Sequence, residues 1–138
     1  VIVSTIDKYG NKEESVSKGG IAQGMPLVVL IDGGTASASE IVAGAIRDYD
    51  LGTLVGTTSF GKGIVQVVLD KIGQEKDGTA LKVTISKYYT PNGENIHKKG
   101  IGPDVTVEYP KELKEKTYSR STDPQFEKAL EIIQEKIK

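Results

Sequence analysis

The sequence predicts a layered α/β domain, and three observations support this prediction. Residues 27–31 (LVVLI) form a continuous apolar run of strand length, as in a parallel strand buried on both faces. Apolar residues then recur at helical spacing, which predicts an amphipathic helix whose buried face carries Ala38, Ile41, Val42, Ala45, Ile46 and Tyr49. Further apolar runs of strand length are separated by glycine-rich turns, so strands and helices alternate along the chain.

The other elements follow from the same kinds of pattern. β-Branched or alternating apolar residues predict strands at 1–6, 53–56, 64–69, 81–86 and 105–107, with an exposed strand at 13–16. A charged turn is expected at 73–78, and a linker or frayed helix at 110–122. Asp123 is expected to cap a last helix, with Pro124 at its first position.

Length and composition fit one globular domain. The chain has 138 residues, of which 37% are hydrophobic and 27% charged, and its net charge is −1. It has no basic block that would favour nucleic acid, and one histidine without cysteine gives no zinc-site pattern. No apolar run has the length of a membrane helix. We therefore expect no metal, no cofactor and no nucleic-acid partner.

Ser37 stands where the turn after Gly33-Gly34 passes into the predicted helix, and two interpretations of it are open. Backbone N–H groups at a helix N-terminus lack intrahelical partners, so they can hold the oxyanion that forms when a serine attacks a carbonyl. The pattern Ser37-x-x-Glu40 before an apolar periodic run is also that of a capping box, in which the serine is only structural.

A serine nucleophile needs a base, and the sequence offers Lys62 and His97. Lys62 lies between Gly61 and Gly63, ahead of an apolar strand, and burial there would favour the neutral amine that a base requires. His97 is the only histidine and follows a turn in a stretch rich in glycine, asparagine and lysine. Each is also consistent with a solvated surface side chain.

Residues 56–62 (GTTSFGK) match the G-x-x-x-x-G-K pattern of a phosphate-binding loop. That motif requires serine or threonine after the lysine and a helix after the loop. This sequence has Gly63 and then a strand-like run at 64–69. Nucleotide binding is therefore the weaker alternative.

Four motifs together resemble the carboxy-terminal processing, or tail-specific, protease family. They are residues 34–41 (GTASASEI), 60–63 (FGKG), 89–96 (YTPNGENI) and 100–104 (GIGPD), and the resemblance covers most of the chain. In that family a serine is the nucleophile and a lysine 25 residues later is the base, and Lys62 lies 25 residues after Ser37. The resemblance also implies that Gln66 orients the lysine and that the backbone N–H of Ala38 forms part of the oxyanion hole.

The implied pairing of Lys62 with Gln66 sets a geometric condition. Residues four apart on a straight strand are separated by about 13 Å, too far for the two side chains to meet easily. We therefore expect the glycines at 61 and 63 to bend or bulge the chain.

The resemblance implies a crotonase-like, ClpP-like α/β core with a mixed sheet and flanking helices. The implied function is a serine endopeptidase that cleaves protein or peptide substrates near nonpolar, unstructured C-termini. A periplasmic, extracytoplasmic or membrane-anchored bacterial parent protein is also implied. A homo-oligomer is a separate expectation, because the strand at Leu27 would leave apolar surface open to self-association. Residues 1–138 are expected to be the C-terminal part of the catalytic domain, without the PDZ module, and inactive alone. The alternative is a non-catalytic α/β binding or structural module in which Ser37 only caps a helix.

Overall fold

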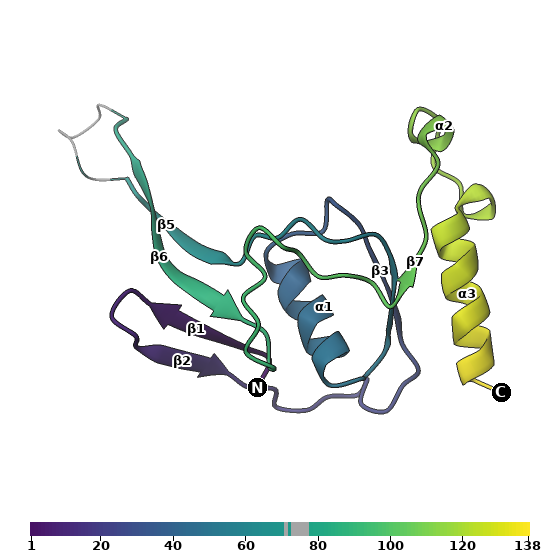
Figure 1. Cartoon of the computed structure of the whole chain (residues 1–138), viewed down its shortest axis with the longest axis horizontal. Coiled ribbons are helices and arrows are strands. Elements are labelled where there is room, and N and C mark those ends of the chain that lie inside the picture. The colour runs from purple at the N-terminus through teal and green to yellow at the C-terminus, as the bar shows by residue number, and fades with distance from the viewer. Residues whose placement is uncertain (71, 73–77) are drawn as a thin grey trace.

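The computed structural model describes residues 1–70, 72 and 78–138 and contains two sheets with helices beside them (Figure 1). The strands are β1 (Val3–Asp7), β2 (Lys12–Ser15), β3 (Val28–Ile31), β4 (Thr53–Gly56), β5 (Ile64–Leu69), β6 (Leu81–Tyr89) and β7 (Val105–Thr106). The helices are α1 (Ala38–Asp48), α2 (Lys111–Lys114) and α3 (Pro124–Lys136), with a 3₁₀ turn η1 (Arg120–Thr122). The α/β class is confirmed, and the predicted turn at 73–78 lies outside the described residues except for Gly78.

A parallel sheet in the order β3-β4-β7 lies between α1 and α3 (Figure 1). The chain passes from β3 through α1 to β4, since parallel neighbours need a crossover connection. The central strand β4 carries Leu54 and Val55, both fully buried. β3 is less enclosed than predicted: within the described residues it pairs only with β4, and Leu30 is 41% exposed.

The other sheet is antiparallel, in the order β2-β1-β6-β5, and its β5–β6 hairpin projects from the rest of the chain (Figure 1). The ladder between β5 and β6 shifts register between Val65 and Gln66, which marks a bulge. At its inner end β6 places Tyr88 in the core, whereas Leu81 and Ile85 are exposed. The alternation of Leu81, Val83 and Ile85 with polar residues predicts a half-buried strand, and this is wrong for the outer part of β6, which extends away from the core.

The core cluster contains Ile31, Ala43, Leu54, Tyr88, Ile96 and Ile101. The face of α1 that enters this core matches the prediction in part, because Ile41 and Ile46 pack against the cluster. Ala38 and Val42 are exposed, and the buried residues of the helix are Glu40, Ala43 and Gly44. A side chain at Gly44 would lie 3.0 Å from the Thr90 methyl carbon, so close packing selects a small residue there. Apolar periodicity does not predict that the carboxylate of Glu40 is buried in the first turn of the helix.

The C-terminal helix begins as predicted. The Oδ1 atom of Asp123 accepts the N–H groups of Gln125 at 2.9 Å and Phe126 at 3.1 Å, and Pro124 is the first residue of α3. The segment expected to be a linker or frayed helix contains α2 and η1. Among the described residues, the helices are too short or too polar to span a membrane.

Candidate active site

Ser37 ends a tight turn that joins β3 to α1. The carbonyl of Asp32 accepts the N–H of Thr35 at 2.9 Å, and its Oδ1 accepts the N–H of Gly34 at 2.9 Å. Ser37 itself has φ 58° and ψ −119°, and a strained backbone of this kind costs about 1–3 kcal/mol. A serine that only caps a helix usually has an extended backbone, whereas a strained serine on a strand-to-helix turn is typical of a nucleophile elbow. The backbone of Ser37 therefore favours a functional role.

Glu40 is the centre of a hydrogen-bond network at the start of α1, and its side chain is fully buried. Its Oε2 accepts the N–H of Ser37 at 2.9 Å and the N–H of Lys62 at 2.8 Å. Its Oε1 accepts the N–H of Gly61 at 2.7 Å and the hydroxyl of Ser59 at 2.6 Å. These donors offset the cost of burying a carboxylate. Because one oxygen binds both N–H groups, the backbones of Ser37 and Lys62 lie side by side.

The loop that carries Lys62 is held from both sides. On one side, the N–H of Phe60 donates to the carbonyl of Thr35, in the turn before Ser37, at 2.8 Å. On the other side, Ser59 donates its N–H to the carbonyl of Ile101 at 3.0 Å, and its Oγ accepts the Ile101 N–H at 2.7 Å. The main chain leading to Lys62 is therefore fixed by two separate segments.

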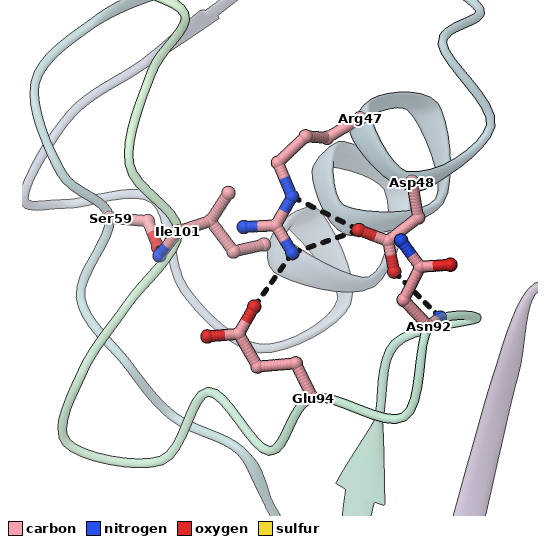
Figure 2. A network of polar contacts seen from close by, with 6 residues as sticks. All are labelled: Arg47, Asp48, Ser59, Asn92, Glu94 and Ile101. Atoms are coloured by element: carbon pink, nitrogen blue, oxygen red, sulfur yellow. Dashed lines mark hydrogen bonds and ion pairs between the residues drawn. The ribbon is translucent and has the colours of Figure 1, made fainter.

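A second polar network ties the far end of α1 to Asn92 and Glu94 (Figure 2). The Arg47 guanidinium donates to Oδ1 of Asp48 and to Oε2 of Glu94, both at 2.9 Å, and the Asn92 N–H donates to Oδ2 of Asp48 at 2.8 Å. Burial opposes ionisation of the Asp48 carboxyl, but these hydrogen bonds and the Arg47 charge outweigh it and hold its pKa below the ordinary value. The segment that packs on the Lys62 loop is thereby anchored to α1.

The two other predicted site residues occupy different surroundings. Ala38 is the exposed first residue of α1, where backbone N–H groups have no intrahelical partner. Gln66 lies beside the bulge in β5, and its Nε2 donates to Oγ1 of Thr84 at 3.2 Å. Within the described residues, no hydrogen bond joins Gln66 to Lys62. The chain departs from a straight strand at this bulge and at Gly61, whose φ is 86°.

Two of the alternatives raised by the sequence, a histidine base and a phosphate-binding loop, gain no support. In the described part of the chain, Nδ1 of His97 is buried without a hydrogen-bond partner, and no hydrogen bond links this residue to Ser37. Residues 56–62 lead into the strand β5, so the helix N-terminus of a phosphate-binding loop is missing. The residues described include no group of three or more side chains placed to hold a metal ion.

Three polar residues that no sequence pattern marks as functional complete the site: Ser59, Tyr88 and Asn95. The Tyr88 hydroxyl donates to the carbonyl of Lys62 and lies 3.3 Å from the carbonyl of Ser37. The Asn95 amide donates to the backbone carbonyl of Tyr88 at 2.8 Å. Their sequence positions carry no periodic signal, because they lie in two loops and at a strand end. Only the tertiary fold brings them to Ser37.

A layered α/β fold with a strained serine on a strand-to-helix turn is typical of a serine hydrolase. Residues 1–107 match the model of peptidase family S41, and the chain belongs to this family. The carboxyl-terminal-processing protease of Synechocystis sp. is 42% identical over 132 residues, which cover 96% of this chain and 30% of that protein. The carboxy-terminal-processing protease of Bartonella bacilliformis is 43% identical over 131 residues, covering 84% of this chain and 29% of that protein.

Solved structures agree with this assignment. The photosystem II D1 C-terminal processing protease matches with a TM-score of 0.67 and 40% identity, over 78% of this chain and 27% of that one. The tricorn protease, at 20% identity and a TM-score of 0.59, shows the fold alone, over 80% of this chain and 10% of its own. The resemblance predicted from the four motifs is confirmed. The chain spans less than a third of the length of these proteins.

Proposed function

We propose that this chain carries the catalytic residues of a serine endopeptidase that cleaves proteins near their C-termini. The observation that carries the proposal is the shared Oε2 atom of Glu40, which holds the backbones of Ser37 and Lys62 together. The strained backbone of Ser37 supports it. Membership of family S41 supports it too, as do relatives named for carboxyl-terminal processing.

In the proposed reaction, the neutral amine of Lys62 takes the hydroxyl proton of Ser37 while Oγ attacks the scissile carbonyl. The N–H of Ala38, at the start of α1, donates to the oxyanion that forms. The lysine then gives the proton to the leaving amine, and a water that it deprotonates hydrolyses the acyl-enzyme. Gln66, which bonds Thr84 here, would orient the amine by exchanging that partner for Lys62.

Two finer features are proposals that rest on the family resemblance: a preference for nonpolar, unstructured C-termini, and a periplasmic, extracytoplasmic or membrane-anchored parent protein. A homo-oligomer is a further proposal, supported by the exposed apolar side chains of Leu27 and Leu30. We also propose that residues 1–138 form the C-terminal part of the catalytic domain. Because the chain spans only 30% of its Synechocystis relative, we expect it to cleave peptides at least about tenfold more slowly alone than within the full-length protein.

The test uses the full-length protein with an unstructured peptide that ends in apolar residues, and a fluorophosphonate probe that labels activated serines. Ser37→Ala and Lys62→Ala should each abolish cleavage, and the double variant should be no worse, because residues that act as a unit are non-additive. His97→Ala is the matched control and should keep the chemical step. A Lys62→Ala enzyme with near wild-type turnover would overturn the assignment, and a wild-type protein without Ser37 labelling would favour the non-catalytic alternative.

A further inference from the structure

The peptide groups of Ser37 and Lys62 are held in the same way at both ends. Each N–H donates to Oε2 of Glu40, at 2.9 and 2.8 Å respectively. Each carbonyl faces the hydroxyl of Tyr88, which donates to the Lys62 carbonyl and lies 3.3 Å from the Ser37 carbonyl. One carboxylate and one phenol thus bridge two segments that are 25 residues apart in the sequence.

We propose that Tyr88 is a positioning residue that sets the spacing between Ser37 and Lys62. This inference rests on the proposed function, because the spacing matters only if the serine and the lysine react together. Tyr88 contacts the backbone of both residues, and its role is therefore to place them rather than to exchange protons with a substrate.

Tyr88 is itself rigidly placed. Its side chain belongs to the core cluster, and the residue is 4% exposed. Its N–H donates to the carbonyl of Gly63 at 3.2 Å, and its carbonyl accepts the Asn95 amide at 2.8 Å. Asn95 also donates to the Gly63 carbonyl, at 3.2 Å. The strand end that carries the phenol is therefore tied to the residue that follows Lys62.

The phenol also keeps its proton. Burial raises the pKa of Tyr88 to about 12, and the nearby charge of Glu40 adds to the shift. The hydroxyl therefore donates throughout the pH range in which a protease works. It has one proton for two carbonyls, so the carbonyls of Ser37 and Lys62 must approach the same oxygen to share it.

Removing the hydroxyl should leave the two backbones free to separate. A misplacement of about 1 Å at reacting groups can cost on the order of 10²-fold in rate. In the full-length protein, we expect Tyr88→Phe to lower kcat about 10- to 100-fold and to leave KM within about twofold. Tyr89→Phe is the matched control: it removes the same atom one residue along β6, from a hydroxyl without a hydrogen bond in the described structure. It should keep the wild-type kcat.

A second variant background separates positioning from general loss of stability. If Tyr88 acts through the placement of Lys62, adding Tyr88→Phe to Lys62→Ala should not slow the slow residual fluorophosphonate labelling of Ser37 any further. An independent, additive loss would overturn the proposal, as would a Tyr88→Phe enzyme with unchanged kcat. Failure of the proposed function looks different, because the wild-type protein would then neither cleave the peptide nor be labelled.

A fluorinated tyrosine at position 88 keeps the test decisive if Tyr88→Phe does not fold. Its phenol is more acidic but fills almost the same space. The enzyme should be active while the phenol is protonated and lose kcat at a lower pH than wild type, because a phenolate cannot donate to either carbonyl. A pH profile that coincides with that of the wild type would contradict a positioning role for the hydroxyl.

Discussion

The start of α1 and the β5–β6 hairpin meet at residues 62–64, yet they are stabilised in different ways. Around α1, buried polar groups hold three loops together, and Glu40 alone accepts four hydrogen bonds. The outer hairpin has a backbone ladder and exposed apolar side chains, such as Val68 and Leu81. A hairpin held only by its own ladder is marginally stable in water. Ser37 and Lys62 therefore lie in the rigid region, which is the part around α1 held by buried polar groups, whereas Gln66 lies in the hairpin.

Among the substitutions that test this comparison, Glu40→Gln should have the largest effect on stability. Whichever way the amide lies, its NH₂ group faces a backbone donor: Gly61 on one side, or Ser37 and Lys62 on the other. Leaving a buried donor unsatisfied costs about 1–3 kcal/mol, so we expect a loss of about 2–4 kcal/mol from the free energy of unfolding of this region. Hydrogen exchange of peptides covering residues 37–48 and 57–63 in the full-length protein measures this loss of stability.

The matched control is Glu135→Gln, the same chemical change at an exposed position near the end of α3. It should change the free energy of unfolding by no more than about 0.5 kcal/mol. If Glu40→Gln were equally mild, the network at α1 would not be what holds Ser37 beside Lys62.

Gly63→Ala tests how closely the same region is packed. An added Cβ would lie 2.6 Å from the His97 backbone nitrogen, so the loop at 95–98 would have to move. Overpacking of this kind costs about 1–3 kcal/mol, and the measured quantity is again protection of residues 57–63. Gly102→Ala is the control, because nothing lies within 4 Å of an added Cβ there. Equal protection of residues 57–63 from hydrogen exchange in the two variants would show that the loop at 95–98 moves aside at little cost.

Local patterns predicted the parts of the fold that are set locally. The run at 27–31, the helix after Ser37 and the Asp123-Pro124 start of α3 each depend on neighbours in the sequence, and the structure has all three. The candidate residues Ser37 and Lys62 were found by their spacing and by the motifs around them, and Glu40 brings their backbones together.

The rest of the fold and of the site depends on contacts between segments that are distant in the sequence. The pattern Ser37-x-x-Glu40 predicts a capping box, and Glu40 does accept the Ser37 N–H. The same carboxylate turns into the core because the loop at 59–62 supplies three further donors, which no helical pattern encodes. The predicted apolar face of α1 was wrong at Val42, which is 54% exposed.

The carboxyl of Asp48 makes the stability of the region around α1 depend on pH, and Asp48→Asn removes this dependence. The folded-state pKa of Asp48 is depressed, so its stabilising contribution is complete above the unfolded value of about 3.9 and is lost as the pH falls through the lower folded value. We expect the variant to be about 1 kcal/mol less stable than wild type at pH 7, and the difference to shrink as the pH falls below about 3.9. Urea unfolding over a series of acidic pH values and at pH 7 measures this. The control Asp70→Asn, at an exposed side chain, should show no such convergence.

The smallest effect is expected in the hairpin, at Val68→Thr. Val68 is 59% exposed, and threonine keeps its shape and its preference for strands, so the free energy of unfolding should change by no more than about 0.5 kcal/mol. Val55→Thr is the matched change in the fully buried strand β4, where a hydroxyl must give up its hydration, and it should cost about 1–3 kcal/mol. Thermal unfolding and Ser37 labelling of both variants, in the full-length protein, make the comparison. If Val68→Thr were as costly as Val55→Thr, the hairpin would be packed against another part of the protein, and the position of Gln66 would be as firmly fixed as that of Lys62.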